Sequence, residues 1–111
     1  MTVGRNTGVF GTATRSSTLL AIQLLGETHA SELACLLGRS LSRIQSAIDS
    51  LEDTGLVVGV EEGKTRRVRL NPRFHAIKEL ESLLSAMGAA DVELQKRLAG
   101  KRRRPRRSGK P

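Results

Sequence analysis

The sequence predicts a mainly α-helical domain with a small β-hairpin, an α+β fold. Aliphatic residues recur at helical spacing in three short segments before residue 55, and glycines separate these segments. A β-branched run at 56–60 and an alternating basic and apolar run at 66–70 flank a turn sequence containing Gly63, which is typical of a hairpin. Apolar residues at intervals of three and four between 77 and 98 predict a long final helix.

The length of 111 residues suits one small domain with tails. Residues 1–15 are rich in Gly and Thr and are expected to form a flexible N-terminal arm, and residues 16–99 form the folded domain. Nine Lys or Arg and no acidic residue follow residue 95, so residues 1–95 carry only ten basic against eleven acidic residues. We therefore expect residues 100–111 to be a disordered basic tail.

Each of the three short helices has a hydroxyl residue before it and a glycine after it. We expect the helices at about 17–25, 29–37 and 41–54, with their apolar faces turned to a common core. In the third helix the predicted buried stripe is Leu41, Ile44, Ile48 and Leu51. The expected N-caps are Ser16 or Ser17, Thr28 and Ser40, and the expected stops are Gly26, Gly38 and Gly55.

The second strand of the hairpin alternates between two faces. Val68 and Leu70 are expected to face the core, which places Arg67 and Arg69 on the opposite face. Arg66 shares the side of Val68 but lies near the tip, where its guanidinium can reach solvent. Basic side chains on such a hairpin fit two purposes: they contact phosphates, or they protect the strand edges from aggregation.

The final helix starts after Pro72 and carries a stripe that is long for so small a domain. Asp91 occupies an inward position and Gly88 weakens the middle, so a single rod and a helix broken at Gly88 both remain open. The stripe packs either onto the domain or against its copy in a second chain, and we expect a homodimer. The stripe is Ile77, Leu80, Leu84, Met87, Leu94 and Leu98, and the first four are the expected dimer interface.

A family resemblance rests on four segments, namely Ser31-Glu-Leu-Ala, Ser40-Leu-Ser-Arg-Ile, Leu51-Glu-Asp-Thr-Gly-Leu-Val and Gly63-Lys-Thr-Arg-Arg-Val-Arg-Leu-Asn. In this order, over residues 17–87, the chain resembles winged helix-turn-helix regulators of the ArsR or MarR type. The resemblance implies a winged helix-turn-helix fold with a C-terminal dimerisation helix. It also implies sequence-selective binding of double-stranded DNA by a homodimer that regulates transcription in the cytoplasm, in association with the nucleoid.

The exposed side of the third helix is the expected base-reading surface. Short hydroxyls leave room to approach base edges, Arg pairs bidentately with guanine, and Gln does so with adenine. The start of this helix offers free N–H groups to a phosphate. Ordinary solvent-facing residues remain the simpler interpretation of this helix face. For the hairpin, Glu61 and Glu62 favour protection of the strand edges, since they would lie near phosphates. The expected base contacts are Ser42, Arg43, Gln45 and Ser46, and the expected backbone contacts are Arg39, Ser40, Lys64, Arg66 and Arg67.

Other functional classes lack their motifs in this sequence. Cys35 is the single cysteine, lies beside a leucine stripe and is expected to be a small core residue, while His29 and His75 are far apart. We therefore expect no metal site and no cofactor. No catalytic motif predicts an enzyme, and no apolar run reaches the roughly 20 residues that span a bilayer, so no membrane partner is expected.

Two alternatives to a sequence-selective regulator remain open. The chain is a non-specific DNA-organising protein if the basic tail provides most of the binding. It is a winged-helix protein-interaction module if the nearly neutral body never contacts DNA. Affinity that is independent of sequence would favour the first alternative. A 1–95 fragment that binds a protein partner but no duplex would favour the second.

Overall fold

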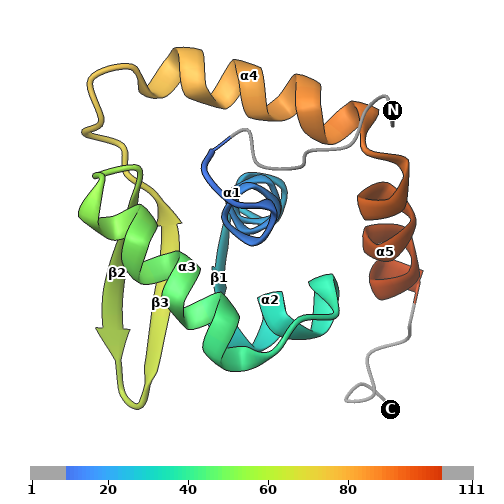
Figure 1. The fold of residues 1–111 in the computed structure, drawn as a ribbon, viewed down its shortest axis with the longest axis horizontal. Helices are drawn as coiled ribbons and strands as arrows, with labels where there is room; N and C mark the ends of the chain where they lie inside the picture. Colours follow the sequence, from blue (N-terminus) through green and yellow to red (C-terminus); the bar gives the residue numbers. More distant parts are fainter. Residues whose placement is uncertain (1–9, 104–111) are drawn as a thin grey trace.

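The structure, a computed structural model, describes residues 10–103, with side chains from 10 to 100 (Figure 1). Residues 1–9 of the expected arm and residues 104–111 of the expected tail lie outside the described residues. The described part is mainly helical with a small antiparallel sheet, so the expected α+β class is confirmed. In chain order the elements are α1 (Ala13–Leu25), β1 (Glu27–His29), α2 (Ala30–Leu37), α3 (Leu41–Asp53), β2 (Val57–Glu62), β3 (Thr65–Leu70), α4 (Ile77–Ala90) and α5 (Val92–Arg103).

Helix α1 begins at Ala13, inside the segment expected to be a flexible arm. Thr12 is its N-cap, and the Thr12 hydroxyl accepts a hydrogen bond from the Arg15 N–H at 3.0 Å. Neither Ser16 nor Ser17 caps the helix, because both lie within it. The ordered domain therefore starts before residue 16, and it includes Arg15.

Helix α1 is the centre of the domain. In Figure 1 it lies between α3 and α4, and it packs against both. Residues 19–22 are all fully buried, as expected for a helix that is covered on more than one side. The other helices and the sheet complete the core with Leu33, Leu36, Ile44, Ile48, Leu51, Val57, Val68, Leu70, Leu80, Leu84, Leu94 and Leu98.

The sheet has three antiparallel strands in the order β1-β3-β2, one strand more than the expected hairpin. Strand β1 pairs Thr28 with Val68, so Thr28 is buried in the sheet and is not the N-cap of α2. That cap is His29, whose Nδ1 accepts a hydrogen bond from the Glu32 N–H at 3.3 Å. In β3, Val68 and Leu70 are buried, as the alternation predicts. Strand β1 thus connects the start of α2 to the hairpin.

The turn at residues 38–40 joins α2 to α3. Gly38 has a φ of 66°, a left-handed conformation that suits glycine, and the Arg39 N–H donates back to the last turn of α2 at 3.1 Å. Ser40 caps α3 as expected, and its hydroxyl accepts from the Arg43 N–H at 3.3 Å. Leu41 is 45% exposed and does not belong to the buried stripe, because the first position of α3 lies beyond the edge of the core.

The final helix is broken in two, at Asp91 and not at Gly88. The Asp91 carboxylate accepts a hydrogen bond from the Leu94 N–H at 3.0 Å, and α5 then runs across the direction of α4 (Figure 1). Gly88 instead lies buried in α4, where a β-carbon would approach Leu24 of α1 to 3.2 Å. Helix α5 continues to Arg103, past residue 100, where the disordered tail was expected to begin.

The apolar stripe of the last two helices is used within one chain. Leu80 and Leu84 are 7% and 0% exposed, and the two leucines of α5 are buried as well. Ile77 and Met87 are partly buried against the same core. Because the chain turns at residue 91, the stripe folds back on its own domain, and the four residues expected at a dimer interface do not form an exposed seam.

Candidate nucleic-acid interface

Helix α3 presents a polar face to solvent, opposite its buried stripe. Ser42, Gln45, Ser46 and Asp49 are exposed on this face. Three of the four expected base-reading residues therefore share one accessible helix surface. The serines are short, so the helix backbone can approach a flat or grooved partner closely there. The fourth residue, Arg43, is also exposed but has different surroundings.

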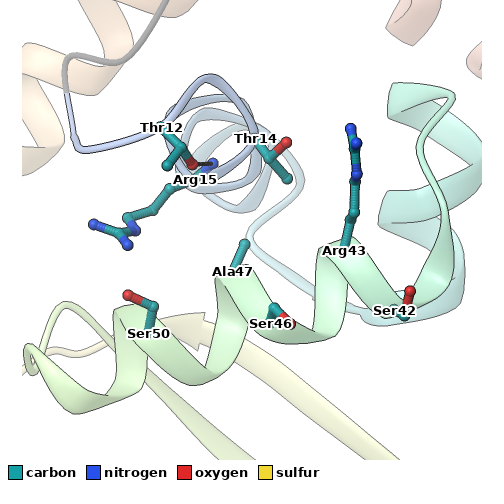
Figure 2. A pocket seen from close by; sticks show the side chains of 8 residues that line it. All are labelled: Thr12, Thr14, Arg15, Ser42, Arg43, Ser46, Ala47 and Ser50. Carbon is teal, nitrogen blue, oxygen red and sulfur yellow. Dashed lines mark hydrogen bonds between the residues drawn. The ribbon is translucent and has the colours of Figure 1, made fainter.

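An open groove of about 380 Å³ lies between the first turn of α1 and α3 (Figure 2). Its walls carry two guanidinium groups and five hydroxyl groups, and none of the lining residues is acidic. Such a set of donors is suited to an anion. The lining residues are Thr12, Thr14, Arg15, Ser42, Arg43, Ser46, Ala47 and Ser50.

Arginines from two elements line this groove, and a third arginine lies next to it. Arg43 rises from α3 on the side that faces α1, and it does not point straight outward with the serines (Figure 2). Arg15 lines the groove from α1. Arg39, in the turn before α3, donates from Nη1 to the hydroxyl of Thr14 at 3.1 Å. The fold thus places Arg39 and Arg43 at the N-terminal end of α3, whereas the guanidinium of Arg15 lies over Ser50, farther along the helix (Figure 2).

Arg15, Arg39 and Arg43 differ in their partners from the arginines that form ion pairs in this fold. Arg66, Arg67 and Arg97 each pair with at least one carboxylate. Residues 15, 39 and 43 have no ion-pair partner within the part of the chain that the structure describes. Their positive charges are therefore not neutralised by a contacting carboxylate, and they remain able to bind an external anion.

Charge is distributed unevenly along α3. Arg39 and Arg43 lie at its N-terminal end, where the helix dipole is also positive. Asp49, Glu52 and Asp53 make its C-terminal half acidic. A polyanion is consequently attracted more strongly to the first half of α3 than to the second half.

The structure corrects the expectation for Arg66. Its Nη1 donates to Asp49 Oδ1 at 3.1 Å and to Glu52 Oε1 at 3.3 Å, and its side chain is 32% exposed. The guanidinium therefore does not reach into solvent at the hairpin tip. The two carboxylates of α3 lie close to β3 and bind it instead. Gly59 permits this contact, because a β-carbon there would collide with the Glu52 carboxylate. Arg66 fixes the hairpin against α3.

The remaining basic residues of the hairpin differ in their ion pairs and in their exposure. Arg67 lies between two carboxylates, with Nε 3.7 Å from Glu27 Oε1 and 3.8 Å from Glu62 Oε1. Lys64 and Arg69 are exposed and make no ion pair among the described residues. The hairpin therefore offers Lys64 at its tip and Arg69 on its outer face more readily than the expected Arg66 and Arg67.

Sequence reasoning did not find the α1 side of the groove. Arg15 and its neighbours Thr12 and Thr14 were assigned to the flexible arm. The available signal was Thr12 itself, because threonine is an N-cap almost as favourable as the serines at 16 and 17. A helix that starts at residue 13 places the arginine at 15 in its first turn.

The position of the single cysteine also differs from the predicted one. Cys35 is exposed on α2 and is not a core residue, because the helix turns Leu33 and Leu36 inward. Within residues 10–103, no group of three or more His, Cys, Asp or Glu side chains is placed to hold a metal ion. None of the helices in this described range combines the length and the apolarity needed to cross a bilayer.

Comparison with known proteins returns no match: no family model fits the sequence, and neither a curated protein nor a solved structure is significantly similar to the chain.

Proposed function

We propose that this chain is a sequence-selective, double-stranded DNA-binding protein of the winged helix-turn-helix type, and that it regulates transcription. The observation that carries the proposal is the exposed polar face of α3 beside a groove that Arg15 and Arg43 line and that Arg39 borders. The order α2, turn, α3 and hairpin agrees with the arrangement that the resemblance implies, and strand β1 is an addition to it.

The arrangement of charge around α3 supports this function. The major groove of B-DNA is about 12 Å wide and admits one helix. If α3 enters it, Ser42, Gln45 and Ser46 face base edges. Arg43 then lies toward one phosphate strand, and Lys64 of the hairpin lies on the other side of α3, which is the side that carries the Arg66 contact. Each flank of the reading helix thus carries a basic side chain, Arg43 or Lys64, that makes no ion pair among the described residues.

Gln45 provides the test of base reading. We expect Gln45→Ala to weaken binding to the preferred site by roughly 1–3 kcal/mol and to relax the preference at one base pair, because Gln reads adenine through two hydrogen bonds. The measurement is fluorescence anisotropy on the site and on its single-base-pair variants. The matched control is Gln23→Ala, since Gln23 bonds to Ser85 on α4 and not to the α3 face. An equal loss on every duplex would show that Gln45 does not read sequence.

A second candidate function, non-specific DNA organisation through the basic tail, is supported by the location of the positive charge. Seven of the 19 Lys and Arg residues lie in the last eleven positions, largely outside the described residues. We expect that ending the chain after Gly100 reduces the steepness of the salt dependence of DNA binding by several units, because each lost phosphate contact removes about 0.9 from the log–log slope. An unchanged slope would exclude the tail from DNA binding. If only sequence-independent affinity disappears, the tail adds general attraction to specific recognition.

A further inference from the structure

The groove between α1 and α3 contains a donor that the protein itself does not satisfy. Arg15 Nε is buried and has no hydrogen-bond partner within the described part of the chain. Its Nη1 donates to the Phe10 carbonyl at 3.3 Å, which holds the guanidinium in place. Gly11 leaves the space for it, because a β-carbon there would collide with Arg15 Nη1. A buried donor without an acceptor is unfavourable, so the protein leaves part of the hydrogen-bonding capacity of Arg15 unfilled beside the groove that this residue lines.

The start of α1 adds to the same electrostatic pattern. The first turn of this 13-residue helix contains no acidic residue, so nothing local compensates the positive end of its dipole. Thr12 and Thr14 line the groove at this end (Figure 2), where the Thr12 hydroxyl accepts from the Arg15 N–H and the Thr14 hydroxyl accepts from Arg39. The groove therefore combines arginines, serine hydroxyls and the positive end of a helix dipole, which favour a phosphate group.

We propose that the groove binds the phosphodiester backbone of the DNA strand that borders the major groove entered by α3, with Arg15 and Arg43, at opposite ends of the groove (Figure 2), donating to separate phosphate groups. This inference rests on the proposed function. It changes the role of Arg43 from base reading to backbone contact, because Arg43 lies on the α1 side of α3 and shares the groove with Arg15. It also gives Arg15, which sequence patterns place outside the site, a direct contact with DNA.

The first test is Arg15→Gln in the full chain, measured by fluorescence anisotropy over a range of salt concentrations. We expect the magnitude of the log–log salt slope to fall by about one, and the affinity to fall about tenfold on every duplex sequence. The matched control is Lys78→Gln, which removes one positive charge from α4, separated from α3 by α1. The control should keep the wild-type slope. Circular dichroism shows whether each variant is folded, and Arg43→Gln, at an exposed position, provides a second variant with the same expectation.

The second test identifies the partner group. A series of duplexes, each with one neutral methylphosphonate linkage, is titrated with the wild-type chain and with Arg15→Gln. We expect one linkage position that weakens wild-type binding but leaves the variant unaffected, because the two changes remove the same contact. If the wild-type chain binds duplexes through α3 but no position shows this coupling, the phosphate inference is wrong and the proposed function stands. If Arg15 is needed to bind inorganic phosphate but not duplex, the groove takes a free anion and the DNA contact is excluded. If the wild-type chain binds no duplex at all, the proposed function itself fails.

Discussion

Replacing Leu84 with alanine is expected to lower the free energy of unfolding by about 2–5 kcal/mol. Leu84 is 0% exposed and lies on α4 in the core cluster, with α1 packed beside that helix. Removing three carbons from a fully packed position loses their burial and leaves a cavity, because the neighbouring helices relax only partly. In a domain this small, such a loss is a large fraction of the total stability.

Chemical denaturation of the Leu84→Ala variant measures this effect, and Leu83→Ala is its matched control. Leu83 is the adjacent residue of α4, undergoes the same chemical change and is 47% exposed. The control should lose much less stability. The experiment also tests whether the stripe packs on its own domain or, as the sequence predicts, against a second chain. A wild-type midpoint that rises with protein concentration, together with similar losses for both variants, would contradict packing of the stripe within one chain.

Ser46→Glu is expected to weaken duplex binding by roughly 3 kcal/mol, about a hundredfold, because it places a carboxylate where phosphates approach. Ser46 is exposed on α3 and also lines the groove. The new charge therefore opposes both proposed contacts, the bases and the flanking phosphate. Since the position is exposed, the fold should tolerate the longer side chain.

Anisotropy titration of wild-type chain and variant against one duplex gives the size of the effect. The matched control is Ser82→Glu, the same change at an exposed position on α4. The control adds the same net charge but lies across α1 from α3, so it should retain nearly wild-type affinity. If both variants lose affinity equally, the binding responds only to net charge, and the α3 face is not the interface.

Local patterns predicted the elements whose causes are local. Ser40 caps α3 and the alternation in β3 buries Val68 and Leu70, as the sequence indicates. Strand β1 was missed, because three residues are too few to show alternation, and Thr28 at a helix start is equally consistent with a cap. The partner of β1 is β3, about forty residues away, and a single sequence contains no signal for that pairing.

The last helices show how tertiary packing decides an ambiguous pattern. The stripe from Leu80 to Leu98 has the spacing of a coiled-coil seam, and spacing alone does not reveal the turn at Asp91. In the fold, α5 returns along the domain, and Arg97 donates to the Leu36 carbonyl of α2 at 2.9 Å. That contact joins residues 61 positions apart in the sequence, and local spacing contains no signal for it.

The candidate site was predictable where it lies on one helix and not where it lies between elements. Helical periodicity alone identifies Ser42, Gln45 and Ser46 as exposed. The groove requires α1 to pack across α3, and the pairing of Arg66 with Asp49 requires the hairpin to fold against the same helix. These placements depend on tertiary contacts. For that reason a residue outside the predicted site, Arg15, joins the groove, and Arg66 of the predicted site has a structural role.

The central claim is that the α3 face reads double-stranded DNA, and selection from a random duplex library tests it most directly. The full chain is used at about 0.15 M salt, where non-specific phosphate attraction is reduced, and Ser46→Glu is selected in parallel. We predict that the wild-type chain enriches one common motif and that Ser46→Glu does not; an inverted repeat with half-sites about one helical turn apart would add a homodimer. A folded wild-type chain that enriches no motif, or a variant that enriches the same motif equally well, would contradict the claim.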